Sequence, residues 1–225
     1  MVSSNIVGYN RVSINAGLSI LGQQFVAIGG DSNGIENLAP GEDFDPWGSD
    51  FVQVWNGSDY ETYSYYGADA GGVGDDAEAG WGDESQGAVS ATIVNGQAFW
   101  VNASADTTLT TSGEVPKSNT VAINTGLSLV CNPQPAAINI QDIVPDENFD
   151  PWGSDFIQIW NGSDYETYSY YGEDAGGVGA NGEAGWGDES QSIVDVTIPA
   201  GVGFWVNSSA DSVLTFPDNT SSDNN

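Results

Sequence analysis

The sequence predicts an all-β protein built from two tandem homologous modules, each an antiparallel β-sandwich or barrel. Three observations predict this class: a long internal repeat, short aromatic and β-branched runs between Asn-Gly and Gly-rich turns, and no sustained 3.6-residue apolar period. The polar remainder is largely Ser, Thr, Asn and 30 Gly, a composition that favours strands and turns over helices.

The internal repeat divides the chain into two copies. The segment 45–50 (Asp-Pro-Trp-Gly-Ser-Asp) recurs at 150–155, and 49 of the 66 positions in 45–110 are identical to their counterparts at offset 105. Upstream the offset is 109, because copy one carries extra residues between about 22 and 40. We therefore expect copy one to span 1–113 and copy two 114–225, docked end to end through the short linker at 113–118.

Within each copy the strongest strand signal is a hairpin. The runs 51–55 and 60–66 flank Asn56-Gly57-Ser58-Asp59, and the pattern returns at 156–160 and 165–171. Shorter strands are expected in copy one over 12–14, 18–21, 89–94, 99–101 and 107–110. The Gly-rich stretch 67–82 and its twin 172–187 are predicted to be long loops.

The charge excludes several classes of function. The chain has 32 acidic residues against Arg11 and Lys117, no His, and a formal net charge of −30. Nucleic acids and anionic membranes are bound through cations, so neither is an expected partner. No apolar segment of about 18 residues is present, so no membrane insertion is expected.

The same composition argues against an enzyme. Without His there is no imidazole base and no zinc site of the usual ligand type. Paired carboxylates can carry out glycoside hydrolysis without His. Each candidate acid occurs twice here, however, and two complete active sites in so short a chain are uncommon, so the sequence predicts a non-enzymatic protein.

Several segments resemble a group of duplicated β-proteins exported by Verrucomicrobia and related bacteria. They are Asn-Ile-Val-Gly-Tyr at 5–9, Ala-Gly-Leu-Ser-Ile at 16–20, Val-Trp-Asn-Gly at 54–57, Gly-Val-Gly-Phe-Trp-Val at 201–206 and the Gly-Glu-Val-Pro linker at 113–116. The resemblance implies an extracellular or cell-surface protein whose signal peptide is removed just before the segment 5–9. It brings no established activity.

The recurring carboxylates are candidate metal ligands. Clustered carboxylates in Gly-rich, carbonyl-rich loops offer the hard oxygen ligands that calcium prefers, whereas the alternative is a set of solvated acidic loops. The candidates are Glu42, Asp45, Asp50, Asp69, Asp83, Glu147, Asp150, Asp155, Asp174 and Asp188. No cofactor is required under either interpretation, and calcium is the one candidate.

The aromatic residues indicate a binding surface. Rings occur on both alternating faces of the hairpin strands, so some of them are expected to point outward. A protein–protein interface is favoured, and a carbohydrate platform is the alternative. The stacking residues of that platform would be Trp47, Trp81, Trp152 and Trp186.

The ends of the copies suggest self-assembly. At offset 109 the linker 113–118 precedes copy two as the N-terminus precedes copy one. End-to-end docking would therefore repeat between molecules, and such a contact does not close. The expected interface residues are Ile6, Val7, Tyr9 and Val115 at one end, and Leu214 and Phe216 at the other.

The sequence-based hypothesis is thus a structural subunit that polymerises with itself, head to tail, into an extracellular filament. Terminal-strand docking or β-augmentation would join the subunits. The alternative is an exported carbohydrate-binding or adhesin module whose aromatic loops bind glycans.

Overall fold

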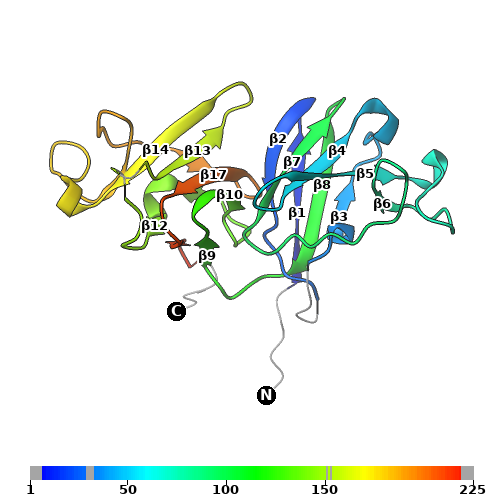
Figure 1. The fold of residues 1–225 in the computed structure, drawn as a ribbon, viewed down its shortest axis with the longest axis horizontal. Helices are drawn as coiled ribbons and strands as arrows, with labels where there is room; N and C mark the ends of the chain where they lie inside the picture. Colours follow the sequence, from blue (N-terminus) through cyan, green and yellow to red (C-terminus); the bar gives the residue numbers. More distant parts are fainter. Residues whose placement is uncertain (1–6, 29–32, 151, 153, 219–225) are drawn as a thin grey trace, which may run out of the picture.

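The computed structural model describes residues 7–28, 33–150, 152 and 154–218. It is all-β, with 48% of residues in strands and 7% in helices, and its small antiparallel sheets form a four-blade, propeller-like ring. The two copies lie side by side along the long axis, copy one in blue to green and copy two in green to red (Figure 1). The predicted all-β class is confirmed.

Copy one contributes a five-stranded sheet in the order β2-β7-β4-β5-β6 and a three-stranded sheet in the order β1-β8-β3. Every strand pair in both sheets is antiparallel. The strands are β1 (Val7–Ile14), β2 (Gly17–Gly22), β3 (Leu38–Pro40), β4 (Phe51–Trp55), β5 (Tyr60–Tyr66), β6 (Gly80–Gly82), β7 (Ala98–Ala103) and β8 (Thr107–Glu114).

Copy two repeats this plan with sheets in the orders β10-β17-β13-β14-β15 and β12-β18-β9, and adds the pair β11-β16. The repeat in the sequence is therefore also a repeat in topology. The strands are β9 (Thr120–Ile123), β10 (Gly126–Cys131), β11 (Ile138–Asn139), β12 (Val144–Pro145), β13 (Phe156–Trp160), β14 (Tyr165–Tyr171), β15 (Gly185–Gly187), β16 (Thr197–Ile198), β17 (Gly203–Ser208) and β18 (Ser212–Thr215).

Within the described residues, the helical content that has defined bounds consists of short 3-10 turns. They are η1 (Ile35–Asn37), η2 (Pro46–Gly48), η3 (Ala68–Ala70), η4 (Ile140–Asp142) and η6 (Glu173–Ala175). Across the residues that the structure describes, no helix has the length and hydropathy needed to cross a bilayer.

The predicted hairpins form with the predicted boundaries. In the first, the Asn56 side-chain oxygen accepts hydrogen bonds from the N–H groups of Ser58 and Asp59, at 3.0 and 2.9 Å. Gly57 takes a φ of 101°, in the region that favours glycine. The β13–β14 hairpin repeats these contacts. Local turn chemistry thus sets the register of the central strand pair in each copy.

The Gly-rich stretches are not entirely loops, contrary to the prediction. Their last three residues form β6 and β15, which pair with β5 and β14. The central residues Trp81 and Trp186 are 4% and 0% exposed. Glycine makes this possible, because a Cβ on Gly82 would lie 2.9 Å from a methyl carbon of Val73. Each Gly-rich stretch therefore places one tryptophan side chain in the core of its own copy.

The strand expected over 89–94 is also not formed. Thr92 makes only an isolated bridge with Gly34, flanked by hydrogen bonds from Ile35 N to Ala91 O and from Ile93 N to Asn33 O. The partner segment turns into η1 at Ile35, so pairing stops there. In copy two the corresponding segment keeps a two-residue strand, β16.

Three hydrophobic clusters hold the molecule together. One draws only on copy one and includes Trp81 and Phe99, and another draws only on copy two and includes Trp186 and Phe204. The third contains residues of both copies. Its buried members are Ile20, Ala98, Trp100, Leu129, Cys131 and Trp205.

Candidate functional site

The two copies meet through the same face of each. The indole N–H of Trp55 donates to the carbonyl of Leu127 at 3.3 Å, and the equivalent Trp160 donates to the carbonyl of Leu18 at 3.2 Å. A contact in which both partners use the same patch is self-complementary and closed. The copies therefore do not dock end to end, contrary to the prediction, because in this interface (the joint) each copy covers the patch that the other copy uses.

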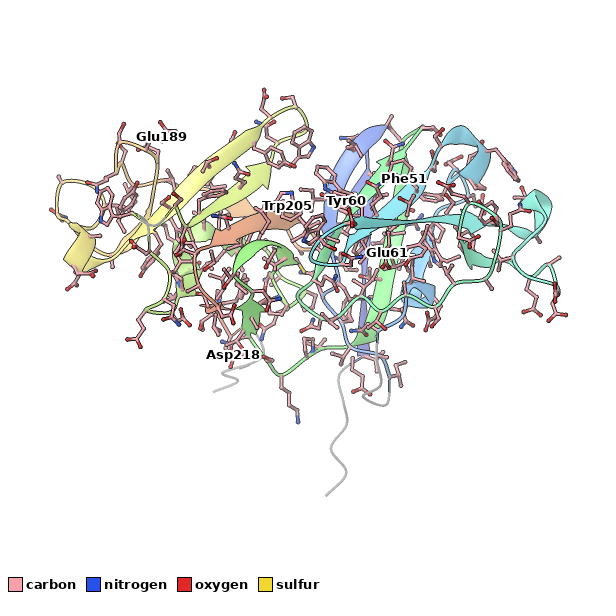
Figure 2. All side chains as sticks on the ribbon, viewed as in Figure 1. Phe51, Tyr60, Glu61, Glu189, Trp205 and Asp218 are labelled. Atoms are coloured by element: carbon pink, nitrogen blue, oxygen red, sulfur yellow. The ribbon has the colours of Figure 1, made fainter. Side chains whose placement is uncertain are left out.

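Aromatic rings continue the reciprocal pattern. Trp55 packs edge-on against Trp205, and Trp100 packs edge-on against Trp160, with 5.8 Å between ring centroids in each pair. Figure 2 shows Trp205 and Tyr60 between the two halves of the molecule. Tyr60 accepts a hydrogen bond from the indole N–H of Trp100 at 3.2 Å. The joint is thus built around four indoles, which the sequence-based prediction did not assign.

At two pairs of equivalent positions in the joint, the copies differ in side-chain size. Gly22 and Cys131 are equivalent positions, and a Cβ on Gly22 would overlap the Cys131 side chain. Ala98 and Gly203 are also equivalent, and a Cβ on Gly203 would overlap that of Ala98. At each of these two places the joint has room for one side chain. Burial raises the pKa of the Cys131 thiol, which keeps it protonated.

Each copy carries a cleft beside an exposed tryptophan, away from the joint. In copy one the cleft has a volume of about 630 Å³. Trp47 at its edge is 68% exposed. The acidic residues that line it are Glu42, Asp43, Asp45 and Asp69.

A hydrogen-bonded turn fixes Trp47. The carboxylate of Asp45 caps η2 by accepting a hydrogen bond from the Trp47 N–H at 2.9 Å. The fully buried Asp50 accepts from the Asp45 N–H at 2.9 Å and from the Ser104 N–H at 2.6 Å. Tyr66 packs edge-on against the indole, with 5.7 Å between ring centroids. The exposed ring therefore sits on a rigid base.

Copy two builds the same site. Its cleft has a volume of about 510 Å³, and Trp152 at its edge is again 68% exposed. The Trp152 N–H donates to Asp150 at 2.8 Å, and Tyr171 packs edge-on against the indole at 5.8 Å. The acidic residues that line it are Asp146, Glu147, Asp150 and Asp174.

The tyrosines around the clefts are held neutral. Burial raises the pKa of Tyr66, and the charges of Asp83 and Glu84 raise it further. Burial also raises the pKa of Tyr170, which lines the cleft of copy two. Each cleft combines aromatic rings with several carboxylates, and offers stacking together with acceptors for O–H or N–H groups.

The structure separates the predicted metal ligands into three groups. Asp50 and its twin Asp155 are buried and bonded to loop N–H groups. Asp83 and its twin Asp188 cap turns, each accepting from two N–H groups. The six that line the clefts are Glu42, Asp45, Asp69, Glu147, Asp150 and Asp174.

No described set of three or more Asp, Glu or Cys side chains has an arrangement that could hold a metal ion. Both oxygens of Asp50 and of Asp155 accept from backbone N–H groups, as does one oxygen each of Asp83 and Asp188. Calcium binding by these loops stays a prediction from the sequence.

The predicted stacking residues divide in two. Trp47 and Trp152 are exposed at the clefts, as a glycan platform requires. Trp81 and Trp186 belong to the cores, where their indole N–H groups donate to the carbonyls of Leu38 and Ile143 at 3.0 and 2.7 Å. At 4% and 0% exposed, they do not form an exposed stacking platform.

The predicted subunit-interface residues also divide. Val7 and Tyr9 are exposed on β1, a strand at the edge of its sheet, and Val115 is half-buried in the linker 113–118. Leu214 and Phe216 lie in the core of copy two, and β18 is the central strand of its sheet, paired on both sides. Within the single chain, that end is not a free strand edge. Ile6 lies outside the described residues.

Comparison with protein-family models, with curated proteins and with solved structures finds no match.

Proposed function

We propose that this protein is a non-enzymatic carbohydrate-binding module with two equivalent sites, one in each copy. The observation that carries the proposal is the exposed tryptophan of each cleft. Burying a large apolar side chain is worth about 1.5–3 kcal/mol, and both copies forgo that gain at the same position. Trp47 and Trp152 are instead held outward by a capped turn, a buried aspartate and a tyrosine.

Sugars suit this combination of groups. The flat apolar face of a pyranose stacks on an indole, while its hydroxyl groups donate hydrogen bonds to carboxylates. Four acidic residues line each cleft. A uronic acid or sulfated glycan would be repelled there, so the ligand class is a neutral or amino-sugar polysaccharide.

The duplication gives the proposal its logic. A polysaccharide repeats its own units, so two weak sites on one rigid body engage it together and gain avidity. The reciprocal joint holds the copies at a fixed separation.

We further propose that each copy is a β-sandwich module and that the protein is exported to the cell surface or medium. Each copy has a hydrophobic core drawn from its own residues alone, which supports the β-sandwich module. The resemblance to exported, duplicated β-proteins supports export.

The test is migration through native gels that contain a neutral polysaccharide, run as a panel of glucans, mannans, xylans and the N-acetylated amino-sugar polymer glycol chitin. Trp47→Ala and Trp152→Ala should each weaken retardation, and the double variant should abolish it. Tyr9→Ala is the matched control, because Tyr9 is more exposed than either tryptophan and lines neither cleft. Retardation of the double variant equal to that of the unaltered protein, or no retardation on any gel, would refute the proposal.

A filament subunit is the second candidate function, and one observation favours it. The strand β1 lies at the edge of its sheet and presents Val7 and Tyr9, 58% and 75% exposed. Exposed apolar edge strands are templates for pairing with another chain. Assembly would then use this edge, and not a repetition of the joint between the copies.

Electron microscopy of the purified protein tests that candidate. If β1 mediates assembly, Tyr9→Asp should remove the fibres, while Ile193→Asp, at an exposed site of copy two, should retain them. Fibres that persist in Tyr9→Asp, or a preparation without any fibres, would remove the filament from consideration.

A further inference from the structure

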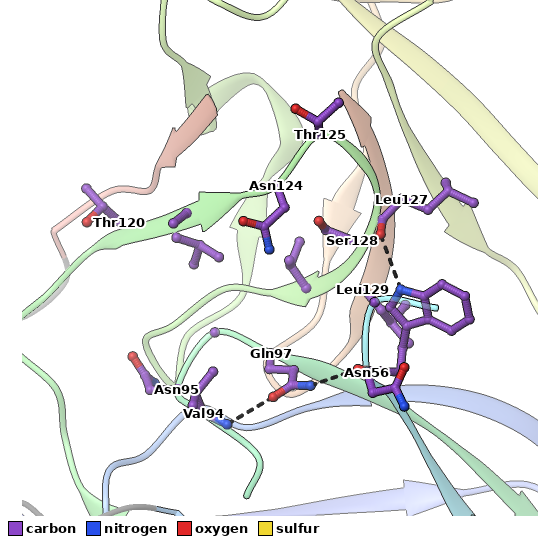
Figure 3. Close-up of a pocket in the computed structure, with 16 residues that line it drawn as sticks. Asn56, Val94, Asn95, Gln97, Thr120, Asn124, Thr125, Leu127, Ser128 and Leu129 are labelled. Atoms are coloured by element: carbon purple, nitrogen blue, oxygen red, sulfur yellow. Dashed lines mark hydrogen bonds between the residues drawn. The ribbon is translucent and has the colours of Figure 1, made fainter. Parts of the chain in front are cut away.

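A third cavity lies at the joint, apart from the two tryptophan clefts. It has a volume of about 510 Å³, within the range of small-molecule sites, and residues of both copies line it. Figure 3 shows the contributions of copy one, among them Asn56 and Gln97, facing those of copy two, among them Asn124 and Ser128.

The lining of this joint pocket carries no charge. None of its sixteen residues is Asp, Glu, Lys or Arg, in a chain with 32 acidic residues. Four side-chain amides, three hydroxyls and the indole of Trp55 are present instead. A neutral lining in so acidic a protein selects an uncharged ligand, and amides with hydroxyls supply both donors and acceptors.

Two of these polar groups are free to bind. The side chains of Asn124 and Ser128 make no hydrogen bond within the described part of the chain, and both face the pocket in Figure 3. The Trp55 indole beside them is fixed by its hydrogen bond to Leu127. Gln97 is held by bonds to the Trp55 carbonyl and the Val94 N–H. Rigid walls therefore surround two available polar groups.

The pseudo-symmetric position on the other side of the joint differs in composition. Asn15 and Ser19 correspond to Asn124 and Ser128 at offset 109. Four other polar residues of the pocket, however, have counterparts that change its chemistry. Asn95, Gln97, Thr120 and Thr125 correspond to Ala200, Val202, Arg11 and Ala16. The pseudo-symmetric position thus has fewer amides and hydroxyls than the pocket, and it carries a cation.

We infer that the joint pocket is a separate binding site for a neutral oligosaccharide, contacted by Asn124, Ser128 and the edge of Trp55. An uncharged ring with several hydroxyl groups matches the free amide, the free hydroxyl and the absence of charge. The inference does not depend on the two tryptophan clefts, and the site would bind in a protein whose clefts are disabled.

The experiment titrates the Trp47→Ala/Trp152→Ala protein with neutral hexasaccharides of glucose, mannose and xylose, and with a charged polygalacturonate oligomer, following backbone amide signals by NMR. We expect at least one neutral probe to shift the signals of Asn124 and Ser128, and the charged probe to leave them unchanged. Adding Asn124→Ala/Ser128→Ala should weaken binding about thirtyfold, because two hydrogen bonds of about 1 kcal/mol each are lost.

The matched control is Asn15→Ala/Ser19→Ala, which removes the same groups from the pseudo-symmetric position. It should change affinity by less than about twofold, and thermal unfolding should show that both double variants are folded. Equal weakening by the two pairs, no shift with any neutral probe, or shifts with the charged probe would each overturn the inference.

Discussion

At the scale of single residues, environment decides what each recurring tryptophan does. Trp47 and Trp81 both sit in acidic, Gly-rich surroundings in the sequence. Trp81 is drawn into the core by the strand β6, whereas Trp47 is held out by η2. The sequence predicted the pair as one class, because the backbone hydrogen bonds that separate them involve partners distant along the chain, such as Ser104 for Asp50.

The first residue-scale prediction concerns Asp50. Asp50→Ala removes the acceptor for the N–H groups of Asp45 and Ser104 and leaves both unsatisfied near the buried site. We expect a loss of about 1–3 kcal/mol in the free energy of unfolding, measured by urea denaturation, together with weaker glycan retention. Asp69→Ala, an exposed cleft residue, should leave stability within about 0.5 kcal/mol. Equal losses in the two variants would contradict this role for Asp50.

The second residue-scale prediction concerns the hairpin tyrosines. Burial, and then the hydrogen bond to Glu61, raises the pKa of Tyr63 to about 12, and Tyr168 beside Glu166 behaves in the same way. A raised folded-state pKa gives stability that is present below pH 10 and is lost as pH rises toward 12. The free energy of unfolding should therefore fall over this window, and fall less steeply in Tyr63→Phe/Tyr168→Phe. Identical pH profiles would contradict the assignment.

At the scale of elements, the sequence predicted correctly those strands whose positions depend on hydrogen bonds within their own turns. The hairpins β4–β5 and β13–β14 have the expected boundaries because Asn56 and its twin Asn161 bond their own turns. The strands β6 and β15 were missed because three-residue strands with two glycines carry no apolar alternation. Their pairing comes from tertiary contacts of a central tryptophan, which a local pattern does not contain.

The packing of β2 against β10 gives the element-scale prediction. Gly22→Ala should destabilise the protein by about 1–3 kcal/mol, since its Cβ would overlap Cys131. Combining it with Cys131→Gly should restore most of that loss, because the exchange places one side chain in the same space. Thermal and urea unfolding of the two single variants and the double variant completes the cycle. Additive losses in the double variant would show that these positions do not share one space.

At the scale of the whole molecule, the repeat was evident from the sequence but its geometry was not. A repeated sequence is compatible with both a translated and a reciprocal arrangement, and the choice depends on which faces are complementary. Trp55 and Trp160, each bonded across the joint, give the reciprocal answer. Their equal spacing in the sequence was visible, but nothing local to either strand shows that they face each other.

The net charge of −30 gives the whole-molecule prediction. Self-repulsion is screened as the Debye length falls from about 30 Å at 0.01 M salt to about 10 Å at 0.1 M, so NaCl should raise the unfolding temperature. EDTA at constant ionic strength should not lower it, because no set of three or more acidic or Cys side chains among the described residues is arranged to hold a metal ion. A drop with EDTA that calcium reverses would contradict this expectation.

The central claim is that the two exposed tryptophans form equivalent glycan sites. The most direct measurement is an NMR titration of the indole N–H signals with the polysaccharide fragment that the gel panel identifies. We predict that the Trp47 and Trp152 signals shift together with one midpoint, while those of the core residues Trp81 and Trp186 stay in place. A titration in which neither Trp47 nor Trp152 shifts would contradict the account.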